Sequence, residues 1–505
     1  MINQLCFCQK LFVNVRILMA RPCLIDRSCR LHRPASGRWL GGIHLVKAAC
    51  VIGASLVGVT SMVNAAASPH DGRVHVAYWE KWAGPEEAAA RTVIDAFNRS
   101  QNRITVEYFI QSPIDRKTLV AVAGGDPPDI AGLWIHNIAS FADAEALTPL
   151  DSFIEADGLT KEQWLDRYYP VYARAVQHSG HVYSGIATPA MIALHWNKTL
   201  FREAGMDPER PPKTLAELDD FARRLTKRDP QTGALLQVGF LPQEPGWWPW
   251  IFCRWFGGQV FDGRNITLAT DPHNIAAMQW VASYSKTLGR DAVTSFASGF
   301  AGQMASPQSG FFSGKVAMIF QGVWYNNYIR QYKPGLDYGV APSWPTVVPG
   351  IDDFAMAEAD MLVIPRGARH PREAWEFIKY MNSHNQNAQT REELQGMELM
   401  CYLQQKNSAL REWSPFFTNH HPHPHIDVFR KLSASPHAVS VPDVGIWTEC
   451  EREILAAFAD IRLLRATPEQ ALTAAQRRLD KSWTRHRESL ERHGQLPPSG
   501  VATSP

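Results

Sequence analysis

The sequence predicts an α/β fold with more than one core. Residues 74–79 and 104–110 are rich in β-branched and aromatic residues, and a helix-like segment, residues 85–99, lies between them. That segment places Ala89 and Val93 on one helical face. Apolar residues make up 45% of the 505 positions and charged residues 20%, which is typical of globular domains and long enough for several of them. Alternating strands and helices favour a mostly parallel sheet covered by helices.

The next strand predicts where a ligand would lie. Residues 124–128 form a Gly/Pro turn, and residues 129–134 after it form a short apolar strand. This strand ends on Trp134, as the first strand ends on Trp79. Ligands of open α/β sheets bind at the carboxyl ends of the strands, so we expect both indoles at one edge of the sheet.

Later segments repeat the same alternation of helices and strands. Helix N-caps are indicated at Ser112, Thr214, Asp271, His370 and Thr467, and residues 361–365 form a short apolar strand. No repeat of fixed period is present, and residues 496–505 are predicted to be a disordered tail.

The net charge of +2 conceals an acidic body. Residues 1–65 hold eight lysines and arginines but one acidic residue, so the remainder of the chain is mildly acidic. This argues against a nucleic-acid partner bound through its phosphates.

Residues 1–67 read as a secretory leader. A basic stretch ends at Lys47, residues 48–63 carry no charge, and small residues follow at 64–68. We expect export across the inner membrane with cleavage near residue 65 or 67, giving a periplasmic protein. The alternative is an uncleaved membrane tether, although 16 apolar residues are short for a span. Met19 is an alternative start.

Five of the eight cysteines precede the expected cleavage site, leaving Cys253, Cys401 and Cys450. An odd number at wide spacing is no disulfide framework. We expect buried free thiols, with a bridge between Cys401 and Cys450 as the alternative.

The 17 tryptophans are the main candidates for function. Trp79 and Trp134 end strands, with Glu80, Lys81, His136 and Asn137 beside them as polar candidates. Core packing is the alternative for each indole. Pro249 interrupts the tryptophan cluster at residues 247–250, which therefore cannot all face one core.

Two other motifs are set aside. Three histidines at 421, 423 and 425 project to one side of an extended chain, but no cysteine or carboxylate flanks them closely, so a solvated Pro-rich loop is preferred over a metal site. Residues 310–316 superficially evoke a phosphate loop, but their spacing is short and Val316 replaces the Ser/Thr that holds Mg²⁺.

Several stretches, in order, resemble the extracellular solute-binding proteins of ATP-binding-cassette importers, specifically the sugar-binding family 1. They are GDPPDI at 125–130, ALTPLD at 146–151, NKTLFREAGM at 197–206, PPKT at 211–214, FSGKVAM at 312–318, GVW at 322–324, YGVAP at 338–342, IPRG at 364–367 and AWEFI at 374–378.

This resemblance implies a type II periplasmic-binding-protein-like fold, with a cleft between two lobes joined by crossing strands. The expected N-terminal lobe is 68–190 plus 343–385, and the C-terminal lobe is 191–342 plus 386–495. The first crossing is expected at 186–194, with returns near 341–343 and 381–385. The stretch 385–444 is unusually long for the family.

The resemblance further implies a monomeric receptor that binds a sugar by hinge closure and delivers it to the membrane permease subunits of an importer. We expect no catalysis, cofactor or metal. The alternatives are a charged solute, such as a polyamine or organophosphate, or a glycoside hydrolase that uses carboxylates such as Asp352, Asp353 and Glu358. The predicted ligand-binding residues are Trp79, Glu80, Trp82, Trp134, Asn137, Trp247, Trp248, Trp250, Trp324, Asp360 and Trp447.

Overall fold

The chain divides into two units, Met1–Ser68 and Pro69–Pro505. A computed structural model describes residues 72–494, all in the second unit. The predicted leader and the predicted tail lie outside the described residues. Within residues 72–494, no helix combines the length and apolar character that crossing a bilayer requires.

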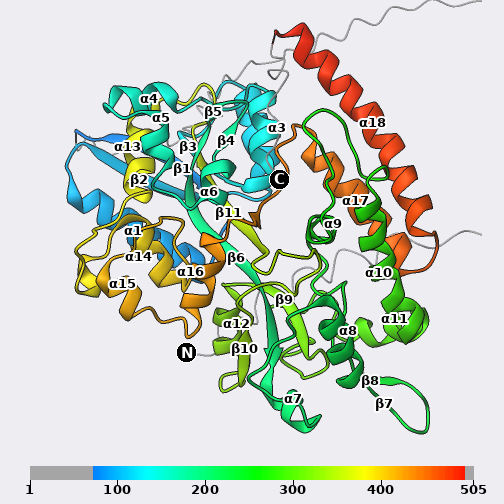
Figure 1. Ribbon diagram of the computed structural model, residues 1–505. Helices are drawn as coiled ribbons and strands as arrows, with labels where there is room; N and C mark the ends of the chain where they lie inside the picture. The colour runs from blue at the N-terminus through cyan, green and yellow to red at the C-terminus, as the bar shows by residue number, and fades with distance from the viewer. Residues whose placement is uncertain (1–71, 495–505) are drawn as a thin grey trace, which may run out of the picture. The chain divides into compact units, whose positions relative to one another are not determined.

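An eight-stranded mixed sheet organises the second unit (Figure 1). β1 (Val74–Glu80) pairs in parallel with β2 (Ile104–Ile110) and β3 (Ile130–Trp134), as the predicted alternation requires. α1 (Pro85–Ser100) connects β1 to β2. Along the sheet the order is β10 (Tyr338–Val340), β6 (Ser184–Asn197), β11 (Ala355–Val363), β3, β1 and β2, with β9 (Met318–Gly322) paired to β6 and β12 (Ala438–Val439) paired to β11. β1 ends on Glu80 and β3 ends on Trp134, so both residues lie where the carboxyl ends of the parallel strands meet.

Two long antiparallel strands connect the two cores. β6 (Ser184–Asn197) is buried at every position, and β11 (Ala355–Val363) runs against it with an irregularity between Asp360 and Met361. Along β6 a first core cluster includes Ile186, Ala187, Ala190, Met191 and Ala193, whereas a second includes Ile192, Leu194 and Trp196. The expected first crossing at 186–194 is therefore at the centre of β6.

The second core is helical and aromatic. It packs α9 (Trp250–Trp255), α10 (Pro272–Leu288) and α17 (Trp447–Arg462) around the far ends of β6 and β9 (Met318–Gly322). Several buried side chains between Phe311 and Val340 already belong to the first core, before the return expected near 341–343, and β11 joins that core again from Ala355 onwards. We call the two halves the first lobe and the second lobe, after their core clusters.

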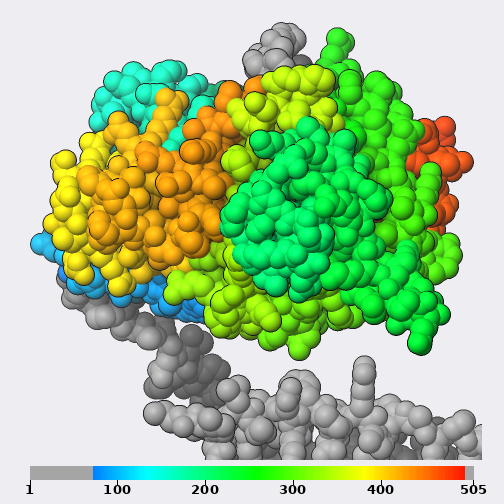
Figure 2. Space-filling model, turned by 60° about the horizontal axis from the view of Figure 1, so that its bottom comes forward, coloured from blue at the N-terminus to red at the C-terminus, as the bar shows by residue number. Residues whose placement is uncertain are grey.

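The long stretch before the last helices packs with the first lobe. α14 (Gly396–Gln404) lies against α1, and α16 (Ile426–Ala434) lies against β6 and β11. Buried side chains from Ala388 to Ala438 belong to the first core, although the sequence assigned 386–495 to the second lobe. In Figure 2 the yellow and orange part of this stretch accordingly lies with the blue and cyan residues of the first lobe. The last return to the second core falls between Ala438 and Val444.

The histidine tract is not a solvated loop. His423 is 2% exposed, and its Nδ1 accepts a hydrogen bond from the backbone N–H of His425. The prediction was wrong because the tract leads into α16 and packs under it; the His423 ring lies 5.1 Å from that of Phe429. Among the described residues, no group of three or more potential ligands is placed to hold a metal ion. Cys253, Cys401 and Cys450 are free and buried, as expected.

The remaining elements connect these layers. They are α2 (Ile114–Ala123), η1 (Ile135–Asn137), α3 (Ile138–Asp143), α4 (Asp151–Ala156), α5 (Lys161–Leu165), α6 (Pro170–Ala175), β4 (Gln177–His178), β5 (His181–Val182), α7 (Lys198–Glu203), α8 (Leu215–Arg224), β7 (Lys227–Arg228), β8 (Leu235–Gln237), α11 (Arg290–Ser298), α12 (Tyr325–Tyr332), β10 (Tyr338–Val340), α13 (Pro371–Met381), η2 (Arg391–Glu393), α15 (Pro415–Asn419), β12 (Ala438–Val439) and α18 (Pro468–Arg492).

Candidate functional site

A buried lysine lies where β1 ends. Lys81 Nζ is 3.0 Å from Glu80 Oε1 and 3.0 Å from Asp360 Oδ1, and it donates to the Gly132 carbonyl at 3.1 Å. The lysine side chain is 3% exposed. Gly132 is required here, because a Cβ at this position would lie 1.9 Å from Glu80 Oε2. All three acceptors of Lys81 are therefore supplied by strand ends of the first lobe and by β11.

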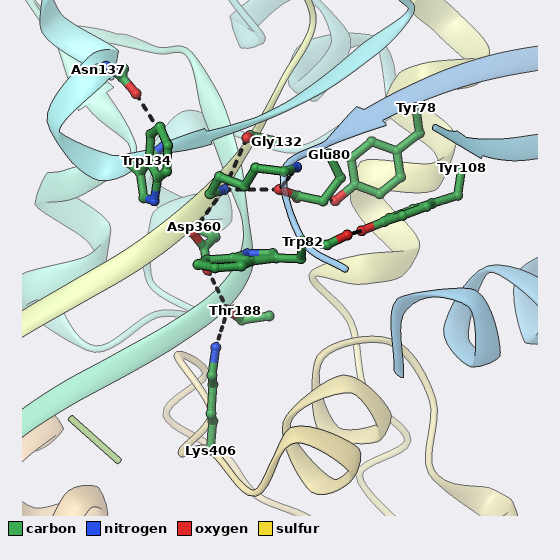
Figure 3. Close-up of polar contacts among 11 residues, drawn as sticks. Tyr78, Glu80, Trp82, Tyr108, Gly132, Trp134, Asn137, Thr188, Asp360 and Lys406 are labelled. Atoms are coloured by element: carbon green, nitrogen blue, oxygen red, sulfur yellow. Dashed lines mark hydrogen bonds and ion pairs between the residues drawn. The ribbon is translucent and has the colours of Figure 1, made fainter. Parts of the chain in front are cut away.

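Asp360 is the second centre of the site (Figure 3). Its Oδ2 accepts hydrogen bonds from Trp82 Nε1 at 3.2 Å and from Thr188 Oγ1 at 3.0 Å. Thr188 Oγ1 in turn accepts from Lys406 Nζ at 2.9 Å. The register explains this meeting, since Asp360 lies opposite Trp134 on β3 and opposite Thr188 on β6.

The titration of these groups is set by burial and by their mutual charges. Burial alone would lower the pKa of Lys81, but Asp360 and Glu80 outweigh it and raise that pKa. Burial would raise the pKa of Asp360, but Lys81 and Lys406 outweigh it and lower that pKa. For Glu80 burial prevails over Lys81, and its pKa is raised. Two carboxyl groups thus face two ammonium groups, which gives a charge-balanced cluster.

Two indoles of the first lobe flank the lysine. Lys81 Nζ lies 5.1 Å from the centroid of the Trp82 ring and 4.9 Å from that of Trp134, within the range of cation–π attraction. Trp134 stacks on the imidazole of His136 at 5.6 Å. Burial, aided by the Lys81 charge, lowers the pKa of His136 to about 4, so this ring is neutral at pH 7. Both indoles are half-buried and present flat apolar surface beside charged groups.

Aromatic residues outside the first lobe continue the cluster. The Trp248 ring lies 6.1 Å from that of Trp324, which packs against both cores. The indole of Trp248 lies near the carboxyl of Glu358, two positions before Asp360 on β11. Burial, with the nearby charges of Glu451 and Asp360, raises the pKa of Glu358 to about 8. Glu358 is therefore largely protonated at neutral pH.

The chain belongs to a known family. The profile of the bacterial extracellular solute-binding proteins matches residues 83–388. This protein is a bacterial extracellular solute-binding protein. Members of that family, and the relatives below, are binding proteins rather than enzymes.

Two curated relatives illustrate the range of this solute-binding protein's similarity. The maltotriose-binding protein of Pyrococcus abyssi is 25% identical over 281 residues, which is 55% of each chain. The sn-glycerol-3-phosphate-binding periplasmic protein UgpB of Pectobacterium atrosepticum is 23% identical over 259 residues, which is 48% of this chain and 54% of UgpB. The chain spans about half the length of these relatives.

Solved structures share the two-lobe, type II fold predicted for this solute-binding protein. CpMnBP1 with mannotriose bound is 27% identical, with a TM-score of 0.67 over 80% of this chain and 99% of CpMnBP1. Lmo0181 from Listeria monocytogenes, in complex with cycloalternan, is 17% identical with a TM-score of 0.64 over 82% and 99% of the two chains. At 17% identity, the similarity to Lmo0181 shows a shared fold alone.

The structure brings together part of the predicted site. Six residues predicted from the sequence lie in the cluster just described: Glu80, Trp82, Trp134, Trp248, Trp324 and Asp360. Trp247 is 39% exposed and lies edge-on to Trp248 at 5.3 Å, at the margin of this cluster.

Four predicted residues lie elsewhere or serve the local fold. Trp250 and Trp447 have no exposed surface and contact each other at 5.5 Å inside the second core. Trp79 precedes Glu80 on β1, so its side chain lies on the opposite face of the sheet from Glu80. There it packs against the first core. Asn137 is 3% exposed, and its Oδ1 accepts from the Trp134 N–H at 3.3 Å, which orders the end of β3.

Sequence reasoning missed Thr188, Lys406 and Glu451. Thr188 lies within an apolar crossing strand, and Lys406 and Glu451 lie beyond the segments that resemble the family. Charge alone gives no signal for them, since most lysines and glutamates are solvated. Two surface recesses, of about 410 and 270 Å³, lie apart from the cluster, beside α18 and around Asp271.

Proposed function

We propose that this chain is the extracytoplasmic receptor of an importer, which binds an uncharged mono- or oligosaccharide and passes it unaltered to permease subunits. The observation that carries the proposal is the charge-balanced pair of Lys81 and Asp360, flanked by Trp82 and Trp134 and continued by Trp324. The relatives include a maltotriose-binding protein and CpMnBP1 with mannotriose bound.

The chemistry of a pyranose fits these residues. Its faces carry C–H groups that stack on indoles, and its rim carries hydroxyls that pair with charged groups. One stack that removes ~100 Å² of apolar surface supplies about 2.5 kcal/mol, whereas micromolar binding needs about 8 kcal/mol net of association costs. Hydrogen bonds to charged groups, at roughly 1.5–3 kcal/mol each, supply the rest. Asp360 and Lys81, 3.0 Å apart, are charged groups of this kind.

Charge balance favours a neutral guest over a charged one. Lys81 is paired to two carboxylates, and Glu358 is largely protonated at neutral pH because its pKa is raised to about 8. A phosphate ester or a polyamine would leave uncompensated charge in a buried site, which is costly. Because the UgpB relative is named for binding sn-glycerol 3-phosphate, the test below includes an organophosphate as the second class of ligand.

Closure follows from contacts on both lobes. A ligand shifts an open–closed equilibrium only to the degree that it prefers one state, and a guest that touches Trp134 and Trp248 prefers the closed one. β6 and β11 cross between the cores and supply the hinge. The leader, residues 1–67, directs export to the periplasm in this proposal, and the mature protein acts as a monomer without a cofactor.

A titration tests the proposal. The full-length chain is expressed, purified after export and titrated calorimetrically with mannotriose, maltotriose, mannose, putrescine and sn-glycerol 3-phosphate, and the recovered sugar is analysed. We expect saturable micromolar binding of a neutral sugar that is recovered intact. Binding of putrescine or sn-glycerol 3-phosphate alone, or cleavage of the sugar between Glu358 and Asp360 acting as acid and base, would contradict it.

A further inference from the structure

One buried ammonium of the cluster comes from outside the part of the chain that matches the family. The family profile ends at residue 388, and Lys406 follows α14 by two positions. Its side chain reaches Thr188 on β6, one hydrogen bond away from Asp360. The segment of residues 386–444, which we call the first-lobe insert, therefore contributes to the site that the proposed function assigns to the sugar.

The turn that presents Lys406 is held in an unusual conformation. Gln405 adopts the left-handed region at φ 55° and ψ 41°, and the Lys406 N–H bonds back to the Cys401 carbonyl at 2.8 Å. A residue other than glycine is strained in this sparsely populated region and remains there only where its surroundings impose it. This backbone directs the Lys406 side chain inward from the end of a helix.

Two asparagines of another helix donate hydrogen bonds to that turn. Asn326 Nδ2 donates to Gln405 Oε1 at 2.7 Å, and Asn327 Nδ2 donates to the Gln404 carbonyl at 2.9 Å. Both belong to α12, which begins directly after Trp324. The helix that follows an indole of the candidate site thus also fixes the position of Lys406.

The ammonium group retains donors that the protein does not use. Lys406 is 6% exposed, and among residues 72–494 the structure records one hydrogen bond from its Nζ, to Thr188 Oγ1. Lys81, by contrast, has Glu80, Asp360 and the Gly132 carbonyl as acceptors. An ammonium carries three N–H donors, and a buried charge is costly unless it is hydrogen-bonded.

We propose that Lys406 binds the guest directly and helps to select it: its spare N–H donors bond to hydroxyl or ring oxygens of a neutral sugar. The first-lobe insert then contributes a specificity-determining residue to the site. This inference rests on the proposed function. Asp360 nearby balances the ammonium charge, so the group favours uncharged oxygen acceptors over a phosphate or carboxylate.

The experiment compares Lys406→Met with Lys431→Met, a change at an exposed lysine of the same insert. Calorimetric titration with mannotriose and with its monodeoxy analogues measures affinity, and thermal melting checks the fold. Loss of hydrogen bonds to a charged donor predicts roughly 10- to 100-fold weaker binding for K406M, and binding within twofold of the original for K431M. Lys406→Gln, which is uncharged and one atom shorter than lysine, replaces K406M if the latter does not fold.

The deoxy analogues separate direct contact from a structural role. In the unmodified protein at least one deoxy position should lose tenfold or more, and in K406M the same deoxy position should cost nothing further. Equal affinity of K406M and the unmodified protein, or an unchanged deoxy penalty, would overturn the role of Lys406 while leaving the proposed function intact. An unmodified protein that binds no sugar of the panel would overturn both.

Discussion

Asp143 of α3 and His486 of α18 join the two lobes by a hydrogen bond of 2.7 Å between Asp143 Oδ2 and His486 Nε2. The other oxygen of Asp143 bonds to His178 Nε2 at 2.7 Å, and His178 Nδ1 bonds to Asp443 in turn. Gly445 allows this approach, since a Cβ there would lie 1.9 Å from Asp143 Oδ2. Asp143, His178, Asp443 and His486 form a hydrogen-bonded contact between the lobes, which we call the clasp. It lies apart from the indoles of the candidate site.

Removing the central charge of the clasp should destabilise the protein. Burial alone would raise the pKa of Asp143, but hydrogen bonds from His178 and His486 hold it at about 2. Asp143→Asn should cost about 3 kcal/mol of unfolding free energy, because it removes one of the two carboxylates that pair with the buried His178 imidazolium. Urea unfolding at pH 7 measures this. Asp166→Asn, at an exposed ion pair with Arg411, should change the same quantity by less than about 1 kcal/mol.

The clasp also predicts a pH range. The depressed pKa of Asp143 gives stability that is present above its unfolded value near 4 and is lost as pH falls towards 2. Burial alone would lower the pKa of His178, but Asp143 and Asp443 raise it to about 10. The stability that the raised pKa of His178 contributes is present below about pH 6.5, the unfolded value, and is lost as pH rises through 10. Unfolding midpoints of D143N that track those of the unmodified protein at both extremes would contradict this account.

Buried neutral histidines should make the protein sensitive to mild acid. Burial lowers the pKa of His195 to about 3 and that of His421 to about 4, and it also lowers the pKa of His423 well below its usual value. The unfolded chain therefore binds more protons than the folded chain below about pH 6.5, and stability falls as pH decreases. Thermal melting between pH 7.5 and 4.5 should show this loss, and His195→Gln should reduce it. A melting temperature that rises towards pH 4.5 would refute the assignment.

Glu358 should weaken the fold at alkaline pH. Its pKa is raised by burial to about 8, so its contribution to stability is lost as pH rises from about 4.5 through 8. Glu358→Gln cannot ionise and should melt at a higher temperature than the unmodified protein at pH 9, with a smaller difference at pH 5. Asp352→Asn, at an exposed carboxylate of the preceding loop, serves as the control and should behave alike at both pH values.

Substituting a tryptophan of the candidate site should affect sugar binding differently from substituting one outside it. Trp134→Ala should weaken mannotriose binding roughly 30- to 100-fold, the equivalent of ~100 Å² of lost apolar contact. Trp413→Ala, in the first-lobe insert, should leave affinity unchanged within twofold because that ring packs against Phe417 and Arg430. Isothermal titration measures both. Equal losses for the two variants would mean that stability, not contact with the sugar, decides the effect.

Local pattern predicted the elements that create the site edge. Strand-like runs ending on Trp79 and Trp134 specified β1 and β3, because the period of apolar residues and the turn at 124–128 are local signals. The two-lobe fold followed from resemblance, not from periodicity. Which indoles pack in a core could not be read from the sequence, since Trp250 and Trp248 are neighbours with different surroundings.

The polar part of the site depends on long-range pairing. Asp360 meets Thr188 only because β11 pairs with β6 in one register, with an irregularity next to Asp360. Lys406 joins them because the first-lobe insert packs on the first core, whereas the sequence placed that segment with the second lobe. Neither relationship leaves a local trace in the sequence.

A crystal structure of the protein with mannotriose tests the central claim most directly. The account predicts sugar rings stacked on Trp134 and on Trp248 or Trp324, with hydroxyls within hydrogen-bond reach of Asp360 and Lys406. A sugar bound elsewhere, touching one lobe alone and leaving these indoles uncovered, would contradict it.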